Sequence, residues 1–243
     1  MLSSAVAFVA VAAVAVSQNR PVNVATTPAD RLSDQWWKDR HAQKLEVTKK
    51  GGIELAFLGD SITHSWEGPG KAVWDHYYGH RRAANFGFSG DRTEHVLWRL
   101  DHGELIPAKP KVVVLMIGTN NVGQGSSNPE QAADGVGAIV DRLKAGIPGV
   151  RILLLAVFPR SLNPQDKLRH DVAEISDRIK KEADGKSVVY LDIGKYFLRP
   201  SGEMRTLLMP DMLHPNENGY MIWAKAMEPT LSRMLGDKPV PPM

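Results

Sequence analysis

Side chains that can cooperate in acyl transfer stand in four separate segments of the chain. Ser61 follows Gly-Asp directly after an apolar run, and Asp211 and His214 lie three residues apart near the end of the chain. A serine hydroxyl is a poor nucleophile at neutral pH, so it needs an imidazole to accept its proton and a third group to orient that imidazole. Asp211 and His214 offer both. Ser61 is therefore a candidate nucleophile, although Gly, Asp and Ser are also favoured in ordinary strand-to-helix turns.

Gly90 and Asn120 lie in the two segments between Ser61 and the Asp211–His214 pair. Gly90, in NFGFSGD, has no side chain to shield its backbone N–H, which can therefore serve an oxyanion. Asn120, in MIGTNN, offers a side-chain amide. Taken singly, each of these residues is more simply a turn, loop or capping residue. Their agreement in four segments favours a shared site.

Alternating strand-like and helix-like patterns set where these residues lie. Continuous apolar runs, typical of strands covered on both faces, predict strands at 53–58, 82–86, 111–117, 150–157 and 188–191. Helices are predicted at 93–100, 129–145, 166–183 and 216–235. The alternation predicts an α/β fold, a three-layer α/β/α domain around a five-stranded parallel sheet. Ser61, Gly90 and Asn120 each follow a strand, so we expect them at the same carboxyl edge.

Two helices are expected to pack through apolar faces. In the extension at residues 18–48, one such face would be formed by Leu32, Trp36, Trp37 and Leu45. In the last predicted helix, a core-facing stripe recurs every three or four residues at Tyr220, Trp223, Met227, Leu231 and Met234. A proline-rich tail follows at residues 237–243.

The first residues favour export. Residues 5–16 are an unbroken apolar run too short to span a bilayer comfortably, and Ala15 and Ser17 are small residues where a signal peptidase reads. We therefore expect residues 1–17 to be a signal peptide, cleaved before Gln18 or, as second choice, after Ala15. The mature protein would be secreted or periplasmic, without stable membrane insertion. Because no Lys or Arg precedes the run, an uncleaved anchor or a mis-assigned start stays open.

Composition excludes several classes of protein. The chain has 243 residues and 43% hydrophobic content, enough for one sizeable core. A formal net charge of +3, without basic runs interleaved with aromatics, predicts no nucleic-acid partner. The absence of Cys excludes disulfides, thiolate metal sites, cysteine nucleophiles and a lipid-modified cysteine. No His pair or His-carboxylate cluster has ligand spacing, so no metal site is predicted.

The four segments together resemble the SGNH (GDSL-type) hydrolase superfamily, whose four blocks carry Ser, Gly, Asn and His. The matching residues are Ser61 in GDSIT, Gly90 in FGFSGD, Asn120 in GTNN and His214 in DMLHP. The chain is more similar still to the catalytic subunits of the intracellular platelet-activating-factor acetylhydrolase, through NFGFSGDRTEHVLWRLDHGEL, KPKVVVLMIGTNN and FPR. This resemblance implies a hydrolase domain at residues 49–236, a flavodoxin-like sheet in the order 2-1-3-4-5, and no cofactor.

The resemblance also implies ester hydrolysis by a Ser61–His214–Asp211 triad. The backbone N–H groups of Ser61 and Gly90 and the side-chain amide of Asn120 would receive the oxyanion. Bacterial relatives with the same blocks deacetylate carbohydrates, so the expected substrate is a small-molecule, carbohydrate or lipid ester. The imidazole and indole of ITHSW beside the nucleophile favour short acyl groups, acetyl above all. The oligomeric state, a homodimer included, stays open.

Other polar residues near the four blocks have structural interpretations. His64 is expected to face along the site wall rather than act as the base, and Asp60 to fix the serine loop through hydrogen bonds. Asp91 and Arg92 are expected to cap the helix that starts near residue 93 rather than touch substrate. Two residues at helical spacing are expected to pack or form surface ion pairs, His95 and Trp98.

Non-catalytic classes are the alternatives. A flavodoxin-like module could hold a phosphate ligand in GDSITHS, but it would leave Asp211 and His214 without a role. A degenerate hydrolase used for carbohydrate or partner binding would not need all four blocks intact. An ordinary α/β-hydrolase is disfavoured because Gly-x-Ser-x-Gly does not occur in the chain.

Overall fold

The computed structural model describes residues 22–243, and one parallel sheet organises them. Its strands lie in the order β2-β1-β3-β4-β5, and they are β1 Leu55–Gly59, β2 Ala83–Gly87, β3 Val112–Met116, β4 Arg151–Leu155 and β5 Val188–Leu191. Every neighbouring pair is parallel, so all carboxyl ends lie at one edge. The strand order implied by the resemblance is confirmed. The expected signal peptide lies outside the described residues.

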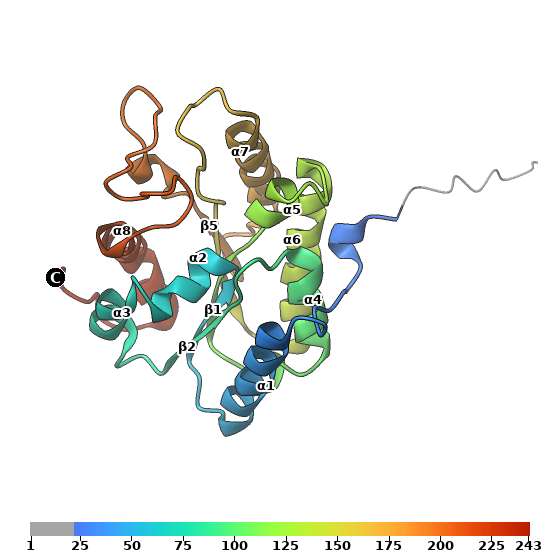
Figure 1. Cartoon of the computed structure of the whole chain (residues 1–243). Coiled ribbons are helices and arrows are strands. Elements are labelled where there is room, and N and C mark those ends of the chain that lie inside the picture. Colours follow the sequence, from blue (N-terminus) through green and yellow to red (C-terminus); the bar gives the residue numbers. More distant parts are fainter. Residues whose placement is uncertain (1–21) are drawn as a thin grey trace, which may run out of the picture.

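Helices cover both faces of the sheet, which confirms the three-layer α/β/α architecture (Figure 1). One face carries α4 Thr93–Asp101, α6 Pro129–Gly146 and α7 Lys167–Ile179, and the other carries α3 Lys71–Tyr78 and α8 Glu217–Leu235. The remaining helices are α1 Gln35–Lys50, α2 Ser61–His64 and α5 Thr119–Gly123, with short 3-10 turns η1 Val24–Thr26, η2 Ser65–Glu67, η3 Ile106–Ala108, η4 Lys180–Glu182 and η5 Gly194–Phe197. No helix within residues 22–243 is both long and apolar enough to cross a membrane.

The core follows the two-residue period of the strands. In β1, Ala56 and Leu58 pack toward α4, α6 and α7, whereas Leu55 and Phe57 pack toward α3 and α8. The stripe predicted on the last helix is buried at all five positions. The sequence did not predict α3, an eight-residue helix that buries Val73 among its aromatic neighbours. Its brevity leaves too few turns for a clear period.

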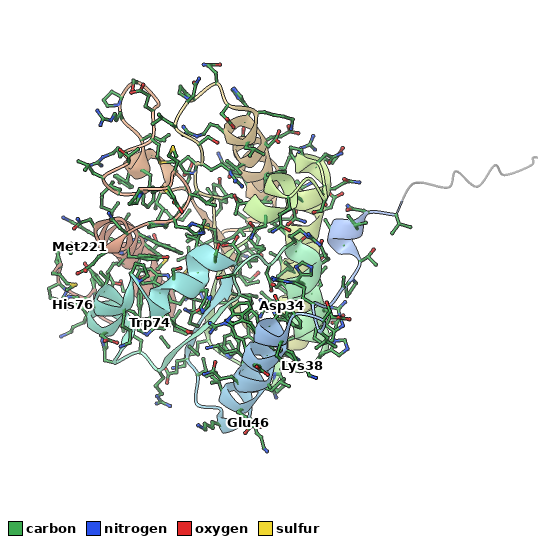
Figure 2. The ribbon with its side chains drawn as sticks, in the orientation of Figure 1. Asp34, Lys38, Glu46, Trp74, His76 and Met221 are labelled. Carbon is green, nitrogen blue, oxygen red and sulfur yellow. The ribbon has the colours of Figure 1, made fainter. Side chains whose placement is uncertain are left out.

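The helix expected in the N-terminal extension is α1, but the prediction of an apolar face is wrong. Trp37 is fully buried, whereas Trp36 is 41% exposed and Leu32 lies before the helix and is also 41% exposed. The buried face is instead largely polar, formed with Trp37 by Arg40, His41, Lys44 and Thr48. Figure 2 shows Lys38 and Glu46 along the same helix, where both side chains are exposed.

A buried charge network explains how a polar helix face can pack. We call it the Asp91 network; it consists of Asp91, Arg99, Glu104, Trp37 and His41. Arg99 donates to Asp91 at 2.9 Å and to Glu104 at 2.6 Å, and all three side chains are fully buried. From α1, the Trp37 indole N–H donates to Asp91 at 2.8 Å, and His41 Nδ1 lies 2.6 Å from Glu104. These bonds join α1 to α4, its neighbour in Figure 1.

We predict that Arg99→Met lowers the free energy of unfolding by about 3–5 kcal/mol, because it leaves the buried carboxylate of Glu104 without its arginine and that of Asp91 with Arg31 alone. Lys71→Met is the matched control, since Lys71 pairs with Asp75 on the surface, where both side chains are more than half exposed, and its loss should cost less than about 1 kcal/mol. Urea unfolding of both variants measures the difference. Equal stabilities would contradict the assignment of the network as a stabilising element.

Candidate active site

Ser61 lies directly beyond the carboxyl end of β1 and begins α2. Asp60 is the N-cap of α2, and its carboxylate accepts the N–H of Ile62 at 2.9 Å. The backbone approach here is close, because a Cβ at Gly87, the last residue of β2, would collide with the backbone of His64. The first turn of α2 is therefore packed directly onto the end of the neighbouring strand, which fixes where the serine stands.

His214 and Asp211 meet Ser61 from the other end of the chain. The Ser61 hydroxyl lies 2.9 Å from Nε2 of His214, and Nδ1 of His214 lies 2.6 Å from Oδ2 of Asp211. The other carboxylate oxygen of Asp211 accepts the backbone N–H groups of Leu213 at 3.0 Å and His214 at 2.7 Å. The structure thus brings the predicted triad together, although Ser61 and His214 lie 153 positions apart in the sequence.

The pKa of Asp211 is set by opposing effects. Its partial burial acts to raise the pKa, but the hydrogen bonds from the backbone and side chain of His214 outweigh it and lower the pKa below its ordinary value. A carboxylate in this state accepts a proton donor at Nδ1, which leaves Nε2 as the acceptor facing the serine hydroxyl.

Helix α8 holds this segment against the serine. Asn216 caps α8 by accepting the N–H of Gly219 at 3.1 Å, so the cap stands two residues after His214. One turn later, the hydroxyl of Tyr220 donates to the carbonyl of Ile62 in α2 at 2.6 Å. A buried hydrogen bond therefore links the helix that follows the histidine to the helix that starts at the serine.

Gly90 stands in the loop after β2 with φ of +77°, a conformation that favours glycine. The turn is held on both sides, because one nitrogen of Arg31 donates to the carbonyl of Ser89 at 2.8 Å and to Asp91 at 3.1 Å. Gln124 donates to the Gly90 carbonyl at 3.1 Å. These contacts fix the loop that carries the Gly90 N–H, next to the helix that begins at Ser61.

Asn120 lies in the first turn of α5, directly after β3. Its side-chain nitrogen donates to the carbonyl of Asp91 at 2.9 Å. An amide carries two N–H groups, so this bond fixes the orientation of the side chain and leaves the second N–H as a donor. Gly90 and Asn120 are thus both tied to Asp91, on two neighbouring loops at the carboxyl edge.

His64 belongs to a different set of contacts from His214. Its Nδ1 lies 2.9 Å from the Ser89 hydroxyl, and its Nε2 lies 3.8 Å from Glu67. Burial, followed by the positive charge of Arg40, lowers the pKa of His64 to about 4, so the ring is neutral near pH 7. The expected position of His64 along the wall agrees with these contacts.

Several expectations for neighbouring residues are corrected. Asp91 does not cap α4; it is fully buried in the Asp91 network. Arg92, in contrast, does occupy the N-cap position as expected, and its side chain pairs with Glu94 at 2.5 Å. Trp66 does not line the site, because it is fully buried in the core near Tyr220. The sequence signal that places Trp66 inside is weak, since an indole serves equally well in a core or a pocket.

His95 and Trp98 pack, as expected from their spacing. His95 is buried and accepts the backbone N–H of Arg92 at 3.0 Å, and burial lowers its pKa to about 3. Trp98 stacks on His102 with ring centroids 3.7 Å apart and contacts Trp37 of α1. Both residues support α4 from outside the serine site.

Arg31 and Trp36 lie beside the candidate site, where no sequence pattern indicated either. Arg31 lies in the polar segment before α1, where no pattern distinguishes it from a surface arginine. Trp36 was assigned to packing, but its ring centroid lies 5.5 Å from that of His64. Adjacent helical residues point about 100° apart, so a pair of tryptophans need not share one face, which is the only sequence signal that one ring stays outside.

A cavity of about 360 Å³ adjoins Asp211. It is lined by Arg160, Ser161, Leu162, Asp166, Asp211, Met212 and Leu213. Arg160 is fixed there by bonds to the backbone and hydroxyl of Thr119 at 3.0 and 3.1 Å. Among residues 22–243, no group of three or more His, Cys, Asp or Glu side chains is placed to hold a metal ion.

The chain is similar in sequence to known ester hydrolases. The sequence profile of the GDSL-like Lipase/Acylhydrolase family matches residues 57–222. The chain is 31% identical over 222 residues to platelet-activating factor acetylhydrolase IB subunit alpha1 of Homo sapiens, covering 90% of this chain and 92% of that protein. It is 30% identical over 222 residues to subunit alpha2 of Rattus norvegicus, covering 91% and 94%.

Solved structures share the fold. A GDSL-like lipase from Bacteroides thetaiotaomicron superposes with a TM-score of 0.67 at 18% identity, covering 80% of this chain and 97% of that one. An acetylxylan esterase from Geobacillus stearothermophilus gives 0.60 at 21% identity, covering 77% and 96%. The fold and the sequence relationship together define the class: the chain belongs to the GDSL-like lipase/acylhydrolase family. It is a carboxylic ester hydrolase.

We predict that Asp60 makes stability depend on pH in an unusual direction. Burial raises the pKa of Asp60 from 3.8 to about 7, so between these values the folded protein binds more protons at this site than the unfolded chain. The stability it contributes is complete below the unfolded pKa and is lost as the pH rises through about 7.

Asp60→Asn removes this titration and keeps an oxygen that can accept the Ile62 N–H. Urea unfolding from pH 4 to pH 8 should show the original protein losing stability relative to the variant as the pH rises, with no further change above that range. A difference in unfolding free energy between the two proteins that stays constant from pH 4 to pH 8 would show that Asp60 does not titrate in this range.

Proposed function

We propose that the protein hydrolyses short-chain esters, acetyl esters above all, with Ser61 as the nucleophile. The observation that carries this proposal is the unbroken set of contacts from the Ser61 hydroxyl to His214 at 2.9 Å and from His214 to Asp211 at 2.6 Å. A serine, an imidazole and a carboxylate in this order provide an activated nucleophile in an esterase.

In the proposed reaction, His214 accepts the Ser61 proton through Nε2 as the hydroxyl oxygen attacks the ester carbonyl. Asp211 holds the Nδ1–H tautomer and stabilises the imidazolium. The imidazolium then protonates the leaving alcohol, and an acyl-serine remains. Water, deprotonated by the same His214, attacks the acyl-serine; the bond to the Ser61 oxygen breaks, the imidazolium returns the proton to that oxygen, and the carboxylic acid is released.

The developing oxyanion would be received by the backbone N–H groups of Ser61 and Gly90 and by the free N–H of Asn120. This assignment is supported by the position of all three donors at the carboxyl edge of adjacent strands, β1, β2 and β3. Donors fixed before the reaction stabilise charge without reorganising, and losing one costs on the order of 100- to 1000-fold in rate.

A short acyl group is supported by the packing beneath the serine. Ile62 and Thr63, which follow Ser61, are 1% and 2% exposed, and Gly87 leaves no room between β2 and α2. A long acyl chain would need a channel through this close-packed layer. Relatives named acetylhydrolase and a structural neighbour named acetylxylan esterase are in keeping with the same choice.

We predict that Ser61→Ala lowers the rate of ester hydrolysis by roughly 10,000-fold or more, as removal of a triad nucleophile does. Labelling by a fluorophosphonate should disappear in the same variant, while its circular dichroism spectrum and unfolding transition stay unchanged. Retention of most activity by a folded Ser61→Ala variant would refute the proposed nucleophile. Absence of labelling in the original protein would favour a binding module instead.

We predict a steep decline in kcat/KM for acyl groups longer than about four carbons. Each methylene that finds apolar contact gains up to about 0.8 kcal/mol, whereas one forced against a closed layer loses more. The measurement is kcat/KM for p-nitrophenyl esters from acetate to octanoate. A maximum at octanoate would contradict the short-acyl proposal.

A further inference from the structure

Trp36 is an exposed indole at the edge of the serine site. It lies in the first turn of α1 with 41% of its surface exposed, whereas the adjacent Trp37 is fully buried. Its ring contacts His64 at 5.5 Å and Phe88 at 6.2 Å between centroids. One side of the indole thus rests on the protein, and a large part of its surface faces solvent.

Trp36 packs against the last residue of the short helix that begins at Ser61. His64 ends the helix that Ser61 begins, and its Nδ1 lies 2.9 Å from the hydroxyl of Ser89, the residue before Gly90. The indole therefore stands beside the rim formed by the serine helix and the Gly90 loop. A group attached to the alcohol oxygen of an ester at Ser61 can extend toward this side.

The first turns of α1, which carry Trp36, are held rigidly. The neighbouring Trp37 donates its indole N–H to the buried carboxylate of Asp91 at 2.8 Å. One turn later, Arg40 donates to the carbonyl of Gly87 at 2.8 Å and forms two bonds with Glu67 at 2.9 and 3.0 Å. The start of α1 is thus fixed to the end of β2, so little conformational freedom would be lost when a ligand stacks on Trp36.

We propose that Trp36 forms a subsite for the sugar ring of a carbohydrate ester, with His64 and Ser89 at its polar rim. This inference rests on the proposed ester hydrolysis and specifies its substrate class. An indole face is electron-rich and attracts the polarised C–H groups on one face of a sugar ring, while neighbouring hydroxyls need polar partners. A flat exposed indole beside an imidazole and a hydroxyl offers both.

The local charges favour a neutral sugar over the cationic headgroup of a choline lipid. An indole also attracts a quaternary ammonium, so charge must distinguish the two. Arg40 and Lys44 share the single carboxylate of Glu67 beside His64, so this carboxylate is already paired with two cations. A choline would therefore find no unpaired carboxylate at Glu67 to balance its charge, whereas a neutral sugar needs none.

The test compares Trp36→Ala and Trp36→Phe with the original protein on acetylated xylo-oligosaccharides and on p-nitrophenyl acetate. The ratio of kcat/KM for the sugar ester to kcat/KM for p-nitrophenyl acetate should fall about 5- to 10-fold in Trp36→Ala, mainly through KM. Trp36→Phe, which keeps an aromatic face, should restore most of the ratio. Deacetylated xylo-oligosaccharide should inhibit p-nitrophenyl acetate hydrolysis more weakly in Trp36→Ala than in the original protein.

Tyr196→Ala is the matched control, because Tyr196 is a similarly exposed aromatic residue, 44% exposed, in the separate turn η5. It should leave the ratio unchanged. An unchanged ratio in Trp36→Ala would overturn the subsite, whether the variant keeps both activities or loses both equally. A selective loss on an acetylated phosphocholine lipid would overturn it too, by assigning the indole to a choline. Failure of the original protein to hydrolyse p-nitrophenyl acetate would refute the proposed function itself.

Discussion

The buried carboxylate of Asp91 is the contact on which the site depends. It has no access to water, so its charge must be balanced inside the protein, and Arg99 and Arg31 supply that balance from α4 and from the segment before α1. Removing either partner would leave a charge in a low-dielectric interior, which costs far more than losing a surface pair. The same residue follows Gly90 and, through its carbonyl, accepts the amide of Asn120. Asp91 thus holds both the loop and the amide that are proposed to bind the oxyanion, the loop through the ion pairs of its carboxylate and the amide through its backbone carbonyl.

The two halves of the site are built differently. The Gly90 and Asn120 side is embedded in the fully buried Asp91 network, whereas Asp211 has 56% of its side chain exposed. Asp211 is held by backbone N–H groups of its own turn, in which Met212 adopts φ of +61°. A non-glycine residue in this region carries local strain, which persists only where the surrounding bonds enforce it. Hydrogen bonds within a tight turn therefore take the place of burial in orienting the histidine.

The elements that depend on local sequence pattern were predicted correctly. The prediction failed where charged residues, which usually lie on the surface, are buried. The five strands and four of the helices follow from apolar runs and spacing, and the order of the strands followed from a resemblance. The polar face of α1 was not predictable, because Arg40 and His41 are buried only through partners far along the chain, Glu67 and Glu104. The sequence predicts Asp91 as a helix cap for the same reason. Its position just before the helix suits a cap, and its buried pairing with Arg99 depends on the folded structure. Trp66 and Trp36 exchanged the positions expected of them, since aromatic residues suit both a core and a binding surface.

The division between a rigid and a partly exposed half suits the proposed chemistry. Donors for the oxyanion serve the transition state best when they cannot move, because any reorientation would consume part of the stabilisation they give. In the proposed reaction His214, in contrast, moves protons: it would take one from Ser61, give it to the leaving alcohol, take one from water and return it to Ser61, all within reach of solvent. A solvent-exposed Asp211–His214 turn leaves that path open, while the hydrogen bond between Tyr220 of α8 and the Ile62 carbonyl keeps the turn from drifting away from the serine. The segment before the sheet also reaches this edge, because Arg31 donates to the carbonyl of Ser89 and Trp36 packs on His64, so the proposed site draws on residues that precede the strands as well as on those that follow them.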